Sequence, residues 1–210
     1  DKYMGDAIMA LFPGRPDDAV AAAIQLNAAL VEFNHERKQK NELEIAIGTG
    51  IHTGPLMLGI LGESERMQGT VISDSVNLSA RLETLTKQLS AYTLTSGETL
   101  SAMEFAEKIS TRYVGKIRVK GKAQALKIYE ILDGMPSRMK ERRIQLKPHL
   151  HAVLKAYESG DMQELQKRLG AYPVPAEEEP VVAIIKSVIK SFGNKGFPEK
   201  WDGTITFDHK

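Results

Sequence analysis

The pattern of apolar and polar positions predicts two amphipathic helices in the first part of the chain. Residues 17–40 repeat apolar side chains at helical spacing, in a stripe formed by Val20, Ala23, Ile24, Leu30 and Val31. Residues 74–87 repeat this pattern with Leu78, Leu82 and Leu85. Each helix therefore has one side suited to a core, and a shorter helix is predicted over 97–104.

Short β-rich segments alternate with these helices. Two strands are predicted within residues 1–12, around the turn-favouring pair Gly5-Asp6. A charged loop is predicted over 62–69, and the remaining predicted strands cover residues 44–52, 56–60, 70–72, 92–95, 113–119 and 126–132. Strands that alternate with helices and close with a hairpin indicate an α/β or α+β sandwich.

The pattern changes after residue 134. Residues 135–147 are basic and loosely patterned, which predicts a linker. Helices are predicted from Pro148, a first-turn proline, to a break at 159–161, then over 161–170 and 176–192. The last begins with three glutamates that suit a helix N-terminus. We therefore divide the chain into residues 1–134, a basic linker over 135–147 and an all-helical tail over 148–210, which resembles one tetratricopeptide-like hairpin.

Composition excludes several classes of function. A formal net charge of +1 gives no global field that would favour nucleic acid or an anionic membrane. The absence of cysteine excludes disulfides, thiolate catalysis and cysteine-based zinc sites. No apolar run approaches the ~20 residues of a membrane span, and the start lacks a signal-peptide pattern. A cytoplasmic location fits these features, with membrane anchorage of a longer parent protein left open.

Taken singly, the polar residues that could carry chemistry have ordinary structural explanations. Gly5-Asp6 is a turn pair, and Lys120-Gly121-Lys122 is typical of a hairpin tip. Asn77 and Arg81 lie one helical turn apart, which is typical of a solvated or ion-paired helix face. The phosphate-binding patterns G-x-x-x-x-G-K-[ST] and G-x-G-x-x-G are absent, and the histidines lack metal-ligand spacing. Only the order of the whole set indicates one chemistry.

Four segments, in this order, resemble signature segments of the class III nucleotidyl cyclases. They are residues 2–12 (KYMGDAIMALF), 50–55 (GIHTGP), 70–83 (TVISDSVNLSARLE) and 119–122 (VKGK). The resemblance covers residues 1 to about 132 without reordering. It implies an α+β fold, the ferredoxin-like cyclase sandwich, here without its first strand and helices and followed by the helical tail.

The resemblance also implies a reaction. The ribose 3′-hydroxyl attacks the α-phosphate in line and pyrophosphate leaves, a displacement that two metal ions, Mg²⁺ or Mn²⁺, assist. Asp6 matches one of the two metal-binding aspartates, and Arg81 matches the arginine that stabilises the α-phosphoryl transition state. Asn77 matches the asparagine that orients the ribose. Lys120 matches the lysine that neutralises the terminal phosphates.

Two further positions match the residues that read the base. Lys2 would donate to a ring nitrogen of adenine, and Thr70 would accept from the adenine amino group. A lysine would oppose the donor at N1 of guanine, so the expected substrate is ATP and the expected product cyclic AMP. The lysine and threonine pair resembles class IIIb, to which bicarbonate-responsive adenylate cyclases belong, but the sequence leaves bicarbonate sensitivity open.

Active sites of this family lie between two chains arranged head to tail. The resemblance therefore implies a homodimer in which Lys2, Thr70, Asn77 and Arg81 come from one chain and Asp6 from the other. The family's first metal-binding aspartate precedes the segment at which this chain begins. We therefore expect a fragment of a longer protein with an upstream regulatory or sensor domain, active when intact and inactive as this fragment alone.

Two alternatives stay open at this stage. One is a catalytically silent cyclase-like module for dimerisation or nucleotide sensing; the other is a guanylate cyclase. The six matching residues argue against the first, because degenerate domains lose several of them. Nucleic-acid binding is disfavoured by the near-neutral charge and the lack of a basic aromatic face.

Overall fold

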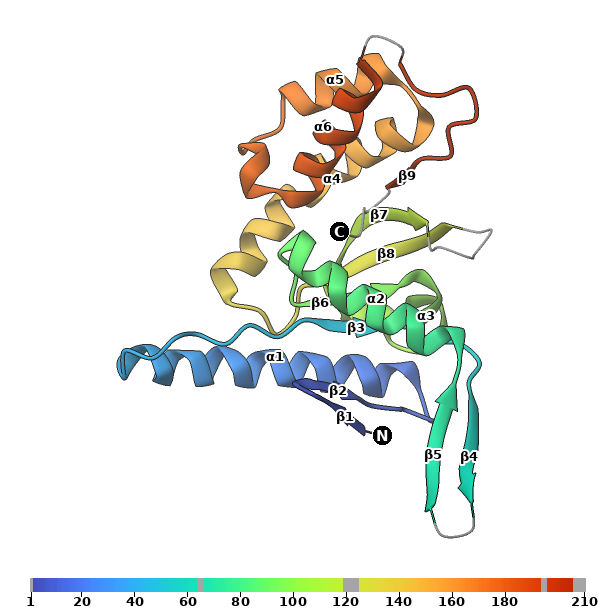
Figure 1. Cartoon of the computed structure of the whole chain (residues 1–210). Helices are drawn as coiled ribbons and strands as arrows, with labels where there is room; N and C mark the ends of the chain where they lie inside the picture. Colours follow the sequence, from blue (N-terminus) through green and yellow to red (C-terminus); the bar gives the residue numbers. More distant parts are fainter. Residues whose placement is uncertain (1, 64–65, 119–124, 194–195, 206–210) are drawn as a thin grey trace.

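A mixed five-stranded sheet forms the centre of the protein (Figure 1). The computed structural model describes residues 2–63, 66–118, 125–193 and 196–205. The strand order is β3-β6-β8-β7-β9, with parallel pairing at β3–β6 and β7–β9 and antiparallel pairing elsewhere. The strands are β3 (Thr49–Ile51), β6 (Thr93–Ser96), β7 (Thr111–Arg118), β8 (Ala125–Ile131) and β9 (Thr204–Ile205). This mixed sheet with helices confirms the predicted α+β fold.

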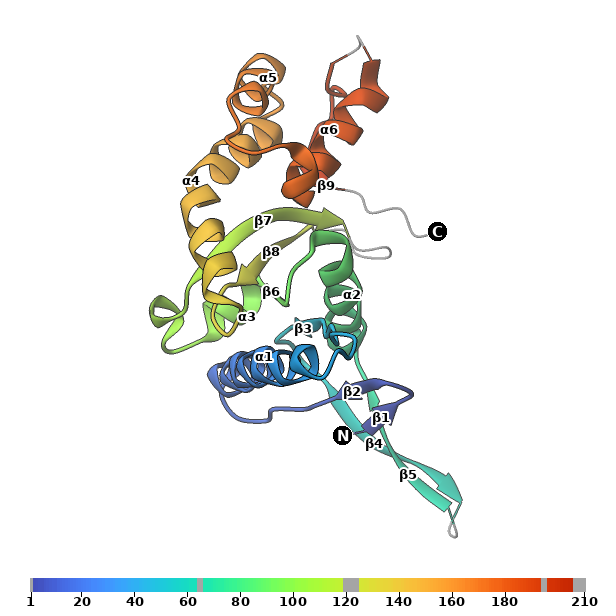
Figure 2. The same ribbon diagram turned by 90° about the vertical axis from the view of Figure 1, so that its left-hand side faces the viewer.

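Helices cover both faces of this sheet (Figures 1 and 2). Helix α1 (Pro16–Gln39) packs Val20 and Ala23 against Ile51 and Ile131. Helix α2 (Asp74–Leu89) packs its leucines against the other face, where they join a larger core. The short helix α3 (Gly97–Ala102) follows β6 and is followed by a 3₁₀ turn, η1 (Ala106–Lys108). The predicted helices at 17–40 and 74–87 are thus confirmed, because their apolar stripes face the sheet.

Two hairpins form separate two-stranded sheets. The first joins β1 (Lys2–Met4) to β2 (Ala7–Met9), as predicted around Gly5-Asp6. The second joins β4 (Met57–Glu63) to β5 (Arg66–Ile72) and projects away from the central sheet in both views. The loop predicted over 62–69 is therefore wrong, because the backbone ladder extends to the pair Glu63 and Arg66.

The strand predicted over 44–52 is mostly wrong. Only Thr49–Ile51 pairs with a neighbouring strand. The backbone of Ile45 is instead bound by the side chain of Asn34 in α1, whose amide donates to the carbonyl and accepts from the N–H, both at 2.8 Å. This side chain takes the hydrogen bonds that a partner strand would otherwise provide.

Three helices follow the sheet. They are α4 (Ser137–Ser159), α5 (Met162–Gly170) and α6 (Pro180–Phe192). The predicted helix start at Pro148 is wrong, because α4 begins eleven residues earlier and holds Pro148 within it. Buried Leu146 and Leu150 fix the helix on both sides of the proline. The glutamates at 177–179 are also misplaced, since two of them lie in a 3₁₀ turn, η2 (Ala176–Glu178), and the third, Glu179, lies between this turn and α6.

One continuous core joins these helices to the sheet. Leu82 and Leu85 of α2 belong to the same buried cluster as Leu154 of α4 and Ile185 of α6. Residues 201–205 are held too, because β9 pairs with the edge of β7 and the Trp201 indole donates to a carbonyl of α4. No helix in the described ranges is both long and apolar enough to cross a membrane.

Gly50 permits α2 to lie against β3. A Cβ atom at this position would be 2.1 Å from the Ser79 carbonyl oxygen and 2.3 Å from the Glu83 nitrogen. Both are backbone atoms of the helix, so no side chain can rotate away to relieve the contact. The glycine therefore sets the distance between this strand and the helix.

We expect Gly50→Ala to lower the free energy of unfolding by about 3 kcal/mol, because the added methyl group forces α2 away from the sheet. Gly170→Ala is the matched control, since a Cβ there meets no atom within 4 Å. Urea unfolding followed by circular dichroism would measure both. Equal stability of the two variants would contradict this account of the α2 packing.

Asp17 links α1 to the segment after α3, and this link predicts a pH dependence. Its carboxylate accepts from the N–H groups of Glu104 at 3.0 Å and Phe105 at 2.9 Å. The bond from Glu104 is the main cause that lowers the pKa of Asp17. The stabilisation is therefore complete above the ordinary aspartate pKa of about 3.9 and is lost as the pH falls through the lowered value.

We accordingly expect the native chain to be more resistant to urea than Asp17→Asn at pH 7. The difference between the two should shrink as the pH falls below about 4, because the carboxyl of the unfolded chain is then protonated, and should be lost once the pH falls below the lowered pKa of the folded chain. Urea midpoints measured from pH 7 to pH 3 provide the comparison. A difference that stays constant over this range would show that the charge of Asp17 is not involved.

Candidate active site

Helix α2 presents Asn77 and Arg81 on one side while its other side is buried. Leu78, Leu82 and Leu85 are at most 6% exposed, whereas Asn77 is exposed and Arg81 is half-buried. Positions four residues apart lie one turn apart on a helix face. An amide and a guanidinium thus stand side by side, where both can contact one polar ligand.

The start of α2 is tied to the turn over residues 52–55. Ser73 caps the helix by accepting from the Ser75 N–H at 2.9 Å. The hydroxyls of both serines donate to the carbonyl of Pro55, at 2.6 and 3.1 Å. The His52 ring is 2.8 Å from the Ser96 hydroxyl. Two of the segments singled out in the sequence, 50–55 and 70–83, are therefore in direct contact.

The other predicted site residues lie on the two hairpins. Asp6 is exposed in the turn between β1 and β2, where Gly5 has a φ of +65° that glycine adopts without strain. Lys2 is half-buried in β1, opposite Met9. Thr70 is opposite Gly59 in the β4–β5 hairpin. The predicted base-reading positions Lys2 and Thr70 thus belong to separate sheets, and Lys120 lies outside the described residues.

The described residues do not form a complete metal site. Among them, no group of three or more histidine, aspartate and glutamate side chains is arranged to hold an ion. Asp6 is a single exposed carboxylate, whereas two ions need carboxylates that bridge or flank them. The part of the chain that is described therefore has one carboxylate, Asp6, at a position predicted to bind metal, and a two-ion site needs a second carboxylate in addition to it.

Four charged side chains form a buried cluster that was not predicted from the sequence. Arg112 of β7 donates to Glu130 of β8 at 2.5 Å and to both carboxylate oxygens of Glu179, at 2.6 and 3.1 Å. Arg143 of α4 donates to Glu179 at 3.2 and 3.3 Å. All four side chains are at most 8% exposed. We refer to these four residues as the ion cluster.

Electrostatics within the ion cluster are balanced. Burial disfavours the charged form of Arg112, but Glu130 and Glu179 outweigh it and raise the pKa of Arg112 above its ordinary value. The Tyr172 hydroxyl also donates to Glu179 at 3.4 Å, and burial, followed by the charge of Glu179, raises the pKa of Tyr172. Two arginines and two glutamates leave no net charge in the interior.

A signal for half of this cluster was present in the sequence. Arg112 is two residues before Val114 in β7, and Glu130 is two residues after Ile128 in β8. Residues two apart in a strand share a face, so each charged side chain is on the same face as a buried apolar neighbour. Glu130 was within the strand predicted over 126–132, whereas Arg112 lies one residue before the strand predicted over 113–119. No such periodicity marks Glu179, because it lies outside regular secondary structure before α6.

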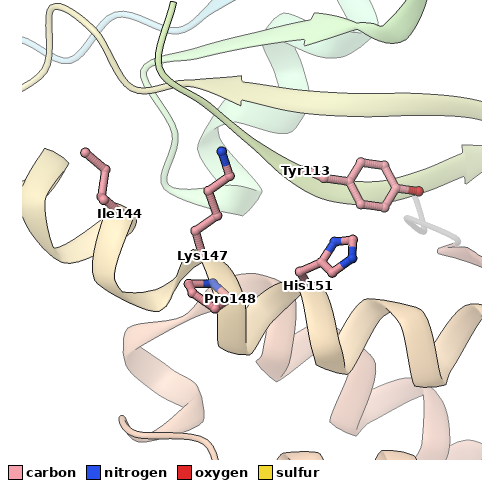
Figure 3. A pocket seen from close by; sticks show the side chains of 5 residues that line it. All are labelled: Tyr113, Ile144, Lys147, Pro148 and His151. Carbon is pink, nitrogen blue, oxygen red and sulfur yellow. The ribbon is translucent and has the colours of Figure 1, made fainter.

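Two surface pockets lie away from α2. One, of ≈310 Å³, is between β7 and α4 and is lined by Tyr113, Ile144, Lys147, Pro148 and His151 (Figure 3). The other, of ≈560 Å³, lies against α3 and β8. Neither pocket is lined by Asn77 or Arg81. These hollows are therefore separate from the side chains that the sequence pattern singled out.

Comparison with known families assigns the region that contains α2 and most of the central sheet. The family of the adenylate and guanylate cyclase catalytic domain matches residues 2–134, which is most of the chain. The chain belongs to this family. The cyclase domain thus comprises both hairpins, α1 to α3 and the central strands up to β8, and it includes five of the six predicted site residues within the described ranges.

The curated relatives of this cyclase domain include proteins named adenylate cyclases. An "Adenylate cyclase" of Anabaena cylindrica is 42% identical over 137 residues, covering 62% of this chain and 27% of the relative. An "Adenylate cyclase, terminal-differentiation specific" of Dictyostelium discoideum is 34% identical over 174 residues, covering 80% of this chain and 8% of the relative. The chain thus spans about a quarter or less of the length of these relatives.

The Dictyostelium match also continues beyond the cyclase domain. Its share of 80% of the chain exceeds what residues 2–134 can supply, so it includes part of the C-terminal helices. Among solved structures, a bacterial light-regulated adenylyl cyclase superposes with a TM-score of 0.56 at 24% identity. That superposition covers 71% of this chain and 43% of the other. The likeness supports the assignment of the cyclase fold.

Proposed function

We propose that this chain is the catalytic part of an adenylate cyclase that converts ATP to cyclic AMP and pyrophosphate. The observation that carries the proposal is the side-by-side presentation of Asn77 and Arg81 on a helix whose opposite side is locked in the core. A guanidinium in a fixed position suits the charge that develops on the α-phosphate. Asn77 orients the ribose so that its 3′-hydroxyl lies in line with the phosphorus.

Lys2 and Thr70 select the base in this proposal. The lysine donates to a ring acceptor of adenine, and the threonine hydroxyl accepts from the amino group. The names of the Anabaena and Dictyostelium relatives support adenine over guanine. Lys120 neutralises the terminal phosphates in the same scheme, on the basis of its place in the sequence pattern.

We propose that the complete site is assembled from a head-to-tail homodimer and a longer polypeptide. Asp6 supplies one carboxylate for Mg²⁺ or Mn²⁺, ions that would polarise the attacking and leaving oxygens when bound. The second carboxylate lies outside this chain. Large apolar side chains exposed on both hairpins support a partner surface, with Tyr3 82%, Ile8 70% and Met57 71% exposed.

A catalytically silent cyclase-like module for dimerisation or nucleotide sensing is the competing function. The incomplete metal site among the described residues favours it. Retention of lysine, aspartate, threonine, asparagine and arginine at the matching positions favours catalysis instead. A guanylate cyclase is the competing function within the family, and the choice of nucleotide distinguishes the two.

The deciding assay measures cyclic nucleotide made from ATP or GTP, with Mn²⁺ or Mg²⁺. It compares this chain with a form extended at its N-terminus into the parent protein. We expect the extended form to produce cyclic AMP, with at least about tenfold preference for ATP, and this chain alone to be inactive, because one metal carboxylate is missing. No product from a dimeric extended form would favour the silent module, and preference for GTP would favour a guanylate cyclase.

Arg81 and Asn77 can then be tested in the active form. We expect Arg81→Ala to lower kcat by about 100-fold or more with a smaller change in KM, because the lost donor acts on the transition state. Lys87→Ala is the matched control, as Lys87 is exposed in the last turn of the same helix. Equal activity of the two variants, both shown to be folded by circular dichroism, would remove Arg81 from the proposed mechanism.

A further inference from the structure

The C-terminal helices contact the end of α2, the helix that carries Asn77 and Arg81. Arg143 of α4 donates to the carbonyl of Ser90 at 3.1 Å. Ser90 is the C-cap residue that directly follows the last residue of α2, and it has a left-handed backbone with φ of 48° and ψ of 43°. Carbonyls at a helix C-terminus are the negative end of the dipole and favour a cation. The guanidinium therefore binds α2 at its end.

Glu179 holds Arg143 in this position. Its carboxylate is fully buried and accepts from both Arg143 and Arg112. Arg112 is bound in turn to Glu130 in the neighbouring strand. Hydrogen bonds therefore connect the sheet to Glu179, Glu179 to Arg143 of α4, and Arg143 to the C-terminal end of α2. Apolar packing follows the same route, since α6 contacts α2 and shares its core.

This attachment fixes α2 along its axis. The start of α2 is bound to Pro55, its middle packs against Gly50, and Arg143 binds the carbonyl of Ser90 at its end. The helix is thus contacted at three points along its length. Arg81 lies nine positions before Ser90, which corresponds to roughly 13 Å along a helix. A shift of α2 along its axis would therefore displace Arg81 in the middle of the helix and Asn77 one turn before it.

We propose that Arg143 and Glu179 are positioning residues for α2, through which the C-terminal helices set the location of Asn77 and Arg81. The inference rests on the proposed cyclase function for its catalytic consequence. The Dictyostelium relative is similar to this chain over part of these helices as well as over the cyclase domain. The C-terminal helices are in this sense part of the catalytic unit, and α2 is their point of contact with the site.

The chain contains a matched control for this proposal. Arg142 and Glu178 form an ion pair one position away from Arg143 and Glu179, but their side chains are 45% and 47% exposed. Exposed ion pairs contribute little to structure. Arg142→Lys therefore changes the same residue type in the same helix turn without touching α2.

The first measurement compares Arg143→Lys with Arg142→Lys by hydrogen exchange over residues 82–91. Lysine keeps the positive charge beside Glu179. It lacks the planar guanidinium whose separate nitrogens donate to Glu179 and to the Ser90 carbonyl at the same time. We expect exchange of the last turn of α2 to rise at least about fivefold in Arg143→Lys and to stay unchanged in Arg142→Lys. Equal exchange in both variants would overturn the proposal.

The second measurement uses the form of the protein that makes cyclic nucleotide. Per folded molecule, we expect Arg143→Lys to lower kcat about tenfold with KM for ATP changed less than twofold, because a displaced Arg81 acts mainly on the transition state. Faster exchange with unchanged kcat would also overturn the proposal, since Arg143 would then stabilise α2 without positioning the site.

A second pair of variants covers a failure of Arg143→Lys to fold. Glu179→Gln keeps the shape and one acceptor oxygen while removing the charge, and Glu178→Gln is its exposed control. The same difference in exchange is expected between these two. If the unsubstituted protein makes no cyclic nucleotide, the proposed function fails, and the exchange comparison alone then decides whether these residues position α2.

Discussion

The ion cluster of Arg112, Glu130, Arg143 and Glu179 is the constraint on which the arrangement of sheet and helices depends. Its members come from β7, β8, α4 and the residue before α6, so they are far apart along the chain. Removing one member of such a cluster leaves a buried charge without a partner, at a cost of about 3–5 kcal/mol. A domain has about 5–15 kcal/mol of stability in total. The four elements must therefore assemble together.

The cluster contributes specificity more than stability. Apolar side chains such as Leu82 and Ile185 can pack in several ways that bury similar area, whereas a planar guanidinium between two carboxylates has one good arrangement. Helix α2 lies within this arrangement and is attached at both ends. The hairpins that carry Asp6 and Thr70 lie outside it, on two-stranded sheets of their own. Half of the proposed site is thus held rigidly, and half projects toward the partner that we propose.

Segments whose structure follows from a local, periodic pattern were predicted correctly, and segments whose structure depends on contacts with other parts of the chain were not. Helices α1 and α2 were predicted because an apolar stripe facing a sheet is a local and periodic signal. The strand at 44–48 was wrongly predicted because the side chain of Asn34 binds that backbone. The strands predicted at 56–60 and 70–72 lie in β4 and β5, but the extension of their ladder to Glu63 and Arg66 was missed because the segment 62–69 is polar and charged. Pro148 was wrongly placed at a helix start because packing on both sides of it outweighs the local preference.

By itself, the sequence determined the cyclase family, the fold class and the spacing that places Asn77 beside Arg81 on one helix face. These depend on residues close together in the chain, where periodicity and motif order are decisive. Only the tertiary structure decided that the C-terminal helices share the core and that Arg143 binds the end of α2. A buried ion pair joins residues with no fixed separation in sequence, so the partners of Arg143 and Glu179 become evident only once the sheet and helices have packed.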